Sequence, residues 1–185
     1  MAKFTFATSK EGFDNHIDKS IRGYSDLWSD ILSLSQYFVE DYTQVVDLGC
    51  SSGKLLKGMI EQNKKHIPHA QYTGIEIEAD FFGDYNDDES KYEMLNYFRG
   101  DVRDFDFENC SLVTSIFTLQ FMAPKNRQEI IQKVYDGLNT GGAFVFSEKT
   151  LSCNPRVQDM MTFCYYDYKR KNFSDKEILD KEVQL

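Results

Sequence analysis

Short apolar runs alternate along this chain with stretches whose apolar residues recur at helical spacing. The apolar runs predict strands at 44–47, 70–76, 97–99, 111–117 and 143–147. The run at 111–117 is almost continuously apolar or β-branched, which is typical of a strand buried on both faces of a parallel sheet. Strands that alternate with helices form βαβ units, so we expect an α/β fold with a doubly wound, mainly parallel sheet.

Helices are expected over 13–40, 54–64, 79–96, 127–138 and 156–185. A break is expected near Gly23 in the first of them, and the acidic patch at 83–88 is expected to interrupt the third. The sequence Asn-Thr-Gly-Gly at 139–142 is interpreted as the stop signal of the fourth. The last stretch is expected to form two helices separated near 172–174.

The length of 185 residues allows a single domain with its own core. We expect an N-terminal helical segment at 1–43, an α/β core at 44–149 and C-terminal helices at 150–185. No run of 18 apolar residues is present, and the N-terminus lacks the apolar core of a secretory signal. We therefore expect no membrane partner and a cytoplasmic location.

The formal net charge of −9 argues against a broad electrostatic surface for nucleic acid. Many of the acidic residues lie at 80–93, and this run is interpreted as a solvated loop and helix face. The four cysteines are far apart, and the chain has only three histidines. Reduced thiols are therefore expected, and no metal site is predicted.

The most specific chemical pattern is Asp-x-Gly-x-Ser-x-Gly, formed by Asp47, Gly49, Ser51 and Gly53 between a strand and a helix. Glycine allows a sharp turn and close approach of a ligand, and the following helix presents free N–H groups. The spacing is neither the dinucleotide fingerprint nor a P-loop. An acid two residues before the first glycine suits a ligand with a positively charged amino acid end, such as S-adenosyl-L-methionine (SAM). The alternative is an ordinary strand-to-helix turn.

Further candidate contacts lie where the next strands end. Glu76 is expected to bind both ribose hydroxyls, with Glu78 as a weaker rival. Asp101 is expected to accept the exocyclic amine of adenine, and the Val102 N–H to meet a ring nitrogen. Phe117 is expected beside the reactive sulfonium. Each residue has an alternative interpretation as a solvated acid or a packed core residue, but their order favours a class I, Rossmann-like SAM-dependent methyltransferase fold.

Several motifs together make the chain similar to one family, the carboxy-S-adenosyl-L-methionine synthases of bacterial tRNA wobble-uridine modification. The matching segments are 22–25 (Arg-Gly-Tyr-Ser), 47–51 (Asp-Leu-Gly-Cys-Ser), 100–104 (Gly-Asp-Val-Arg-Asp), 117–121 (Phe-Thr-Leu-Gln-Phe), 137–143, 147–149 (Ser-Glu-Lys) and 167–170 (Asp-Tyr-Lys-Arg). They occur in the family's order and span nearly the whole chain.

The resemblance implies that Tyr24 reaches the methionine end of the cofactor. It also implies Gly49 in the glycine loop, Glu76 on the ribose, and Asp101 with Val102 at the adenine. Enzymes of this family transfer a carboxylate derived from prephenate to SAM and release phenylpyruvate, so the cofactor would be SAM or carboxy-SAM. The added carboxylate needs cationic help from the pocket.

The sequence departs from this family at two positions. Ile116 stands where the family has asparagine, and Glu182 aligns with the arginine that binds the added carboxylate. An acid would repel that carboxylate, and nearby Lys181 or Arg170 could substitute only if the last helix shifts. The sequence given ends at Leu185, before the antiparallel strand pair usual in class I methyltransferases, so these strands are expected to be missing. The fifth strand would then be an open edge through which the protein could form homo-oligomers.

Three functions are consistent with these observations. The first is a SAM-dependent methyltransferase of unidentified acceptor, since methyl transfer needs mainly positioning and no obligatory base. The second is carboxy-SAM synthesis with a substitute cation, and the third is a non-catalytic SAM-binding or interaction protein. The sequence identifies no catalytic residue. Family membership alone does not decide among the three functions, because fold does not fix function.

Overall fold

The computed structural model describes residues 13–184, which fall into two compact units. The first unit combines residues up to Leu27 with those from Thr150 onward, and the second contains Trp28–Lys149. The helices of the first unit are α1 (Phe13–Ser20), the start of α2 (Tyr24–Phe38), α6 (Pro155–Lys169) and α7 (Asp175–Gln184). Gly23, between α1 and α2, has a φ of 75°, which confirms the break predicted there.

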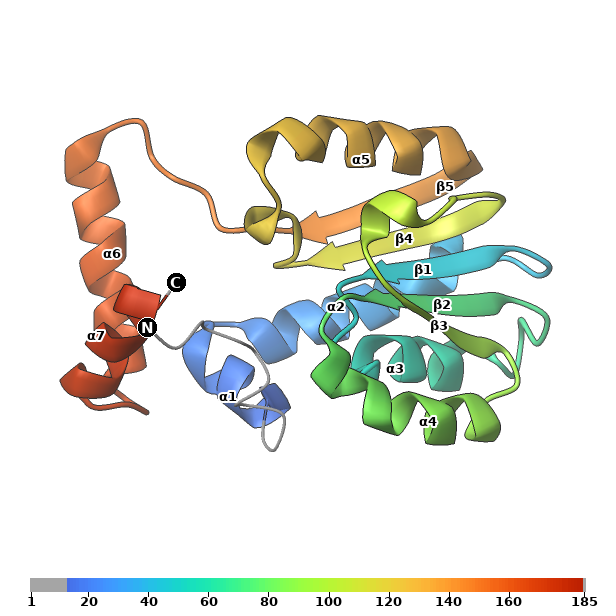
Figure 1. Ribbon diagram of the computed structural model, residues 1–185, viewed down its shortest axis with the longest axis horizontal. Helices are drawn as coiled ribbons and strands as arrows, with labels where there is room; N and C mark the ends of the chain where they lie inside the picture. The colour runs from blue at the N-terminus through green and yellow to red at the C-terminus, as the bar shows by residue number, and fades with distance from the viewer. Residues whose placement is uncertain (1–12, 185) are drawn as a thin grey trace. The chain divides into compact units, whose positions relative to one another are not determined.

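The second unit is built on one five-stranded sheet in which every neighbouring pair is parallel (Figure 1). Its strands are β1 (Gln44–Leu48), β2 (Gln71–Glu76), β3 (Leu95–Arg99), β4 (Cys110–Ile116) and β5 (Leu138–Ser147). The strand order is β3-β2-β1-β4-β5, so the order reverses between β1 and β4. The predicted doubly wound parallel sheet is confirmed.

Helices and short 3-10 turns connect the strands of this unit. They are α3 (Lys54–Asn63), η2 (Ala79–Asp84), α4 (Tyr85–Lys91), η3 (Val102–Asp104), η4 (Leu119–Phe121) and α5 (Pro124–Gly137). The core beneath α5 joins Ile130 and Val134 to Val46 and Leu48 of β1. Burial of such side chains contributes about 1.5–3 kcal/mol each. None of the described helices has both the length and the apolarity needed to cross a bilayer.

The acidic patch at 83–88 does not interrupt a helix as predicted, because α4 begins at Tyr85 and contains most of it. Nor is the acidic run simply solvated. Asp88 pairs with Lys57 at 2.8 Å, and Glu89 pairs with Arg99 at 2.9 Å. These cations come from α3 and β3, so distant parts of the chain compensate charges that local composition assigned to solvent.

The predicted helix end at Leu138 is correct to within one residue, but residues 139–142, interpreted as its stop signal, lie inside β5. Helix α5 ends earlier, at Gly137, where a Cβ atom would lie 2.4 Å from the Phe107 carbonyl oxygen. The glycines instead coincide with a register shift between β4 and β5, and Gly141 has a φ of 90°. Strand β5 is the last strand of the sheet, as the open-edge prediction requires.

Candidate cofactor-binding site

The candidate site lies at the carboxyl ends of the strands, around the reversal of strand order between β1 and β4. Ligands of open α/β sheets bind at this point. Asp47 is the penultimate residue of β1 and Glu76 is the last residue of β2. The predicted loop residues 49–53 connect β1 to α3. The fold therefore brings these acids and the glycine loop to one edge.

The glycine loop has left-handed backbone conformations at three of its positions. Gly49, Ser51 and Gly53 have φ values of 69°, 48° and 68°. A Cβ atom on Gly49 would lie 2.3 Å from the Thr118 hydroxyl oxygen, and one on Gly53 would lie 1.9 Å from the Tyr97 hydroxyl. Both glycines are therefore required by backbone conformation and by close packing.

Ser51 is held at both its main-chain N–H and its main-chain carbonyl group. Its N–H donates to Glu76 Oε2 at 2.9 Å, and its carbonyl oxygen accepts a hydrogen bond from the Tyr85 hydroxyl. The Tyr85 ring stacks on Tyr97, with centroids 3.6 Å apart and planes 4° apart. Neither tyrosine was predicted from the sequence, where both appear as ordinary apolar-face residues. The stacked pair thus supports the loop through the Tyr85 hydroxyl and holds Ser51 in a left-handed conformation that a serine rarely adopts.

Glu76 is the centre of the site's hydrogen bonding. Besides the Ser51 N–H, its carboxylate accepts the N–H groups of Ile77 and Glu78, each at 2.9 Å. Burial raises the pKa of Glu76, and these backbone hydrogen bonds oppose that shift. A carboxylate offers about four acceptor positions, so room is left for a ligand hydroxyl. The geometry favours Glu76 over its rival Glu78, whose main chain supports the carboxylate of Glu76.

Asp47 lies within β1 with only 4% of its surface exposed. Its Oδ1 accepts a hydrogen bond of 2.7 Å from the hydroxyl of Thr114 on β4. Burial raises the pKa of Asp47 to about 7; the Thr114 hydrogen bond opposes this shift, and the charge of Glu76 adds to it. The side chain is thus poised between a neutral and an ionised form near neutral pH, and a neighbouring cation would favour the ionised form.

This pKa predicts a pH dependence of stability. Asp47 binds a proton more tightly in the folded chain than in the unfolded one, so its contribution is greatest below about pH 4. The free energy of unfolding should therefore fall as pH rises from about 4 to 7, by ~4 kcal/mol at most from this group. Urea unfolding of wild type and Asp47→Asn across that range tests this prediction. Equal slopes for the two proteins would contradict it.

Asp101 follows β3, as predicted, but Arg103 already occupies much of its carboxylate. Oδ1 accepts the Arg103 N–H at 2.9 Å and its Nε at 3.0 Å, while Oδ2 lies 2.6 Å from Nη2. The pairing with Arg103 lowers the pKa of Asp101. Val102, expected at an adenine ring nitrogen, is buried at the start of η3. An adenine amine at Asp101 would therefore share this carboxylate with the Arg103 guanidinium, a partner that the sequence analysis did not predict.

The loop after β4 lies against the glycine loop. Strand β4 ends at Ile116, one residue earlier than predicted, because Phe117 adopts a φ of 57°. The hydroxyl of the next residue, Thr118, donates to the Leu48 carbonyl at 2.8 Å. Glu148, which follows β5, accepts hydrogen bonds from main-chain N–H groups of this loop. The sequence analysis used Glu148 only as part of a family motif and gave it no role.

Three residues from the family resemblance keep roles that are predictions only. Tyr24 begins α2 and belongs to the first unit, whereas the other candidate contacts lie in the second. Ile116 is a partly buried residue at the end of β4, in register with Ser147 of β5. The side chain of Glu182 lies outside the described side chains.

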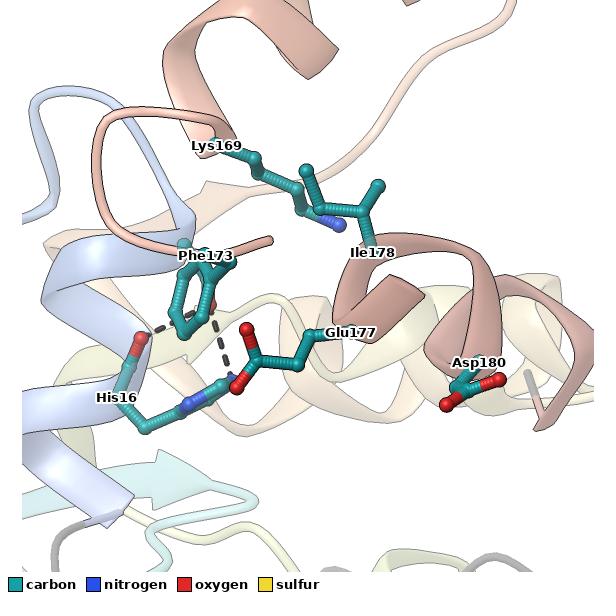
Figure 2. Close-up of a pocket in the computed structure, with 7 residues that line it drawn as sticks. His16, Lys169, Phe173, Glu177, Ile178 and Asp180 are labelled. Atoms are coloured by element: carbon teal, nitrogen blue, oxygen red, sulfur yellow. Dashed lines mark hydrogen bonds between the residues drawn. The ribbon is translucent and has the colours of Figure 1, made fainter. Parts of the chain in front are cut away.

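The first unit contains a cavity of its own, with a volume of about 270 Å³ (Figure 2). It is lined by His16, Ser20, Lys169, Phe173, Glu177, Ile178 and Asp180. The Ser20 hydroxyl lies 3.1 Å from His16 Nε2 but donates its hydrogen to the His16 carbonyl at 2.8 Å. The hydroxyl hydrogen thus points to a main-chain carbonyl and not to the imidazole, so the pair lacks the geometry of an activated nucleophile. Among the residues described, no cluster of three or more side chains suits a metal ion.

Comparison with known proteins gives consistent results. A family profile described as a methyltransferase domain matches residues 45–142. The carboxy-S-adenosyl-L-methionine synthase of Staphylococcus epidermidis is 34% identical over 174 residues, which cover 94% of this chain and 75% of that protein. The Klebsiella pneumoniae enzyme of the same name is 37% identical over 179 residues, covering 95% and 72% respectively.

Solved structures agree on the fold. A Methanococcus maripaludis protein assigned to the SAM-dependent methyltransferases has a TM-score of 0.60 at 14% identity, covering 100% of this chain and 85% of its own. SAM-bound CalS10, an amino pentose methyltransferase from Micromonospora echinaspora, has a TM-score of 0.56 at 17% identity, covering 76% and 57%. With the site geometry and the identities above, the chain belongs to the carboxy-S-adenosyl-L-methionine synthase family and carries a methyltransferase domain.

Proposed function

We propose that this chain binds SAM at the carboxyl edge of its sheet and transfers the methyl group to an acceptor molecule. The observation that carries this proposal is the Glu76 carboxylate, which joins the end of β2 to the Ser51 N–H of the glycine loop. It is a buried anion fixed by three main-chain donors, at the strand end where a ribose is expected. The SAM-bound methyltransferase with the same fold supports the choice of cofactor.

Each residue of the edge has a role in this proposal. Asp47 faces the ammonium end of SAM, Glu76 accepts the ribose hydroxyls, and Asp101 with Val102 meets the adenine. Gly49, Ser51 and Gly53 shape the loop along the methionine end of SAM, and the family resemblance assigns Tyr24 to the same end of the cofactor. Phe117 lies beside the sulfonium.

The sulfonium supplies the driving force for the reaction, so the chain has mainly to orient the donor and exclude water. Buried Asp47 is suited to this because its carboxyl ionises near neutral pH and can neutralise the ammonium group. Its ionisation on binding would release up to one proton at pH 6. The methyl transfer itself requires no base among these residues.

Charge favours SAM over carboxy-SAM as the ligand of this edge. SAM carries a net charge of +1, whereas carboxy-SAM carries none because of its added carboxylate. The Ile116 side chain offers no hydrogen-bond donor to an added carboxylate, and the family alignment has the acid Glu182 in place of the arginine that binds this carboxylate. These residues support methyl transfer as the first candidate function.

The second candidate is synthesis of carboxy-SAM and phenylpyruvate from SAM and prephenate, as a step in tRNA wobble-uridine modification. It is favoured by 34% and 37% identity to two carboxy-S-adenosyl-L-methionine synthases across nearly the whole chain. This function requires a substitute cation, for which Arg170 and Lys181, the nearby cations in the sequence, are candidates if the last helix shifts.

Native mass spectrometry of the purified protein, with identification of any released small molecule, distinguishes these functions. We expect SAM or S-adenosylhomocysteine at one per chain, and no phenylpyruvate when SAM and prephenate are added. Carboxy-SAM in the protein, or prephenate-dependent phenylpyruvate, would establish the second function instead. A protein that neither contains nor binds SAM would leave the non-catalytic interaction role.

The double change Ile116→Asn with Glu182→Arg gives a further expected result. If these two residues suppress binding of the added carboxylate, restoring the family residues should raise the affinity for carboxy-SAM about tenfold or more. Isothermal titration with carboxy-SAM and SAM measures both affinities. Unchanged carboxy-SAM affinity would contradict the argument from charge.

The remaining expectations belong to the same proposal. We infer a cytoplasmic protein that functions as a single domain with the segments 1–43, 44–149 and 150–185. The net charge of −9 supports a small-molecule partner rather than direct nucleic-acid binding. The edge position of β5 supports self-association through that strand, which light scattering can test.

A further inference from the structure

Glu148 occupies a particular place at the carboxyl edge of the sheet. It directly follows β5, whose last residue Ser147 is in register with Ile116, the last residue of β4. The Phe117 N–H still donates to the Ser147 carbonyl, at 2.8 Å. The chain therefore leaves β4 and β5 side by side, and the carboxylate of Glu148 reaches across from one exit to the other.

The two carboxylate oxygens of Glu148 accept three consecutive main-chain N–H groups. Oε1 accepts those of Thr118 at 3.1 Å and Leu119 at 2.8 Å, and Oε2 accepts that of Gln120 at 3.1 Å. Hydrogen bonds to an ionised acceptor are about twice as strong as those between neutral groups. Only a carboxylate can accept on both sides, because an amide presents its own N–H groups on one of them.

The opposite side of the same loop is held as well. Arg127 donates to the carbonyl oxygens of Gln120 and Met122, at 3.1 and 3.0 Å. The Gln120 side chain in turn accepts the N–H of Lys149 at 3.3 Å. Glu148 thus accepts hydrogen bonds from the N–H groups of this short loop, and Arg127 donates to its carbonyl groups. Together they restrain the backbone of the loop at both kinds of group.

This short loop contacts the glycine loop through Thr118. Thr118, held by Glu148, donates its hydroxyl to the Leu48 carbonyl at 2.8 Å. The space where a Cβ of Gly49 would stand is filled by the same hydroxyl, 2.3 Å from that position. A shift of Thr118 would therefore release both the end of β1 and the turn at Gly49.

We propose that Glu148 is a positioning residue of the SAM site, which fixes residues 118–120 against the glycine loop without touching the cofactor. The inference rests on the proposed function, since it assumes that SAM binds along residues 49–53. It explains why the segment 147–149 and the segment 117–121 occur together: the first supplies the acceptor and the second the donors.

The test compares wild type with Glu148→Gln, Glu148→Ala and the matched control Glu93→Gln. Glu93 is exposed, so its change removes the same charge at a surface position. Isothermal titration at a temperature where circular dichroism shows all variants folded should give a SAM Kd at least tenfold weaker for Glu148→Gln. The control should stay within twofold of wild type. Amide hydrogen exchange at 118–120 without ligand should be faster in Glu148→Gln only.

The outcomes separate this inference from the proposed function. If wild type binds SAM and Glu148→Gln binds it equally well, a role in positioning is overturned, even where the variant melts at a lower temperature. Unchanged exchange at 118–120 would overturn it too. Wild type that fails to bind SAM would overturn the proposed function, and this inference with it. Should Glu148→Ala fail to fold, the isosteric Glu148→Gln still decides the question.

Discussion

Replacing Glu76 by Gln is expected to weaken SAM binding by about 100-fold, or ~3 kcal/mol. The amide can accept on one side only, so its NH₂ group would face either the Ser51 N–H or the N–H groups of Ile77 and Glu78. The variant also loses the charge that strengthens hydrogen bonds from the ribose hydroxyls. Titration with SAM and with S-adenosylhomocysteine should show the same loss, because both carry the ribose.

The rival position provides the comparison for this experiment. Glu78→Gln removes an equal charge two residues away, while the main-chain N–H of residue 78 continues to support Glu76. We expect its effect on the SAM Kd to be less than about threefold, as for a partly exposed charge. A larger effect at Glu78 than at Glu76 would show that Glu78, and not Glu76, binds the ribose. Melting temperatures of both variants show whether lost affinity reflects lost folding.

The sequence carried enough information to predict the sheet and the glycine loop. Strands β1 and β2 are short apolar runs followed by an acid at or near their ends, and the loop contains glycine where the backbone turns left-handed. These are local signals, because hydrophobic periodicity and positive φ depend on a few neighbouring residues. Asp47 and Glu76 could be placed at the edge because parallel strands bring their carboxyl ends together.

Contacts between distant residues could not be predicted in the same way. Tyr85 supports Ser51 from 34 positions away, and Glu148 holds Thr118 from 30 positions away. Nothing in the local pattern distinguishes these side chains from a packed tyrosine or a surface acid. Local composition was misleading at residues 139–142, where glycines typical of a helix stop lie within β5 at a register shift.

Replacing Gly53 by Ala is expected to lower the free energy of unfolding by ~3 kcal/mol or more. The left-handed backbone alone accounts for about 1–2 kcal/mol. The rest comes from the Tyr97 hydroxyl, 1.9 Å from the new Cβ, which the ring stacked on Tyr85 prevents from moving away. Gly141→Ala is the matched control, since its φ is 90° and nothing lies within 4 Å of a Cβ there. Its cost should be limited to about 1–2 kcal/mol.

A double-mutant cycle with Tyr97→Phe isolates the steric part of this loss. The Phe variant removes the clashing oxygen, and also its 3.1 Å hydrogen bond to Asp88, so alone it should destabilise by about 1 kcal/mol. The double variant with Gly53→Ala should lose less stability than the sum of the two single losses, with a favourable coupling of about 1–2 kcal/mol. Strict additivity would mean that the Tyr97 hydroxyl oxygen contributes nothing to the requirement for glycine at position 53, which would then rest on backbone strain and on the ring carbons 2.8 and 3.0 Å from the new Cβ. Favourable coupling would mean that the aromatic pair beneath the loop, as well as the turn, dictates glycine in the cofactor site.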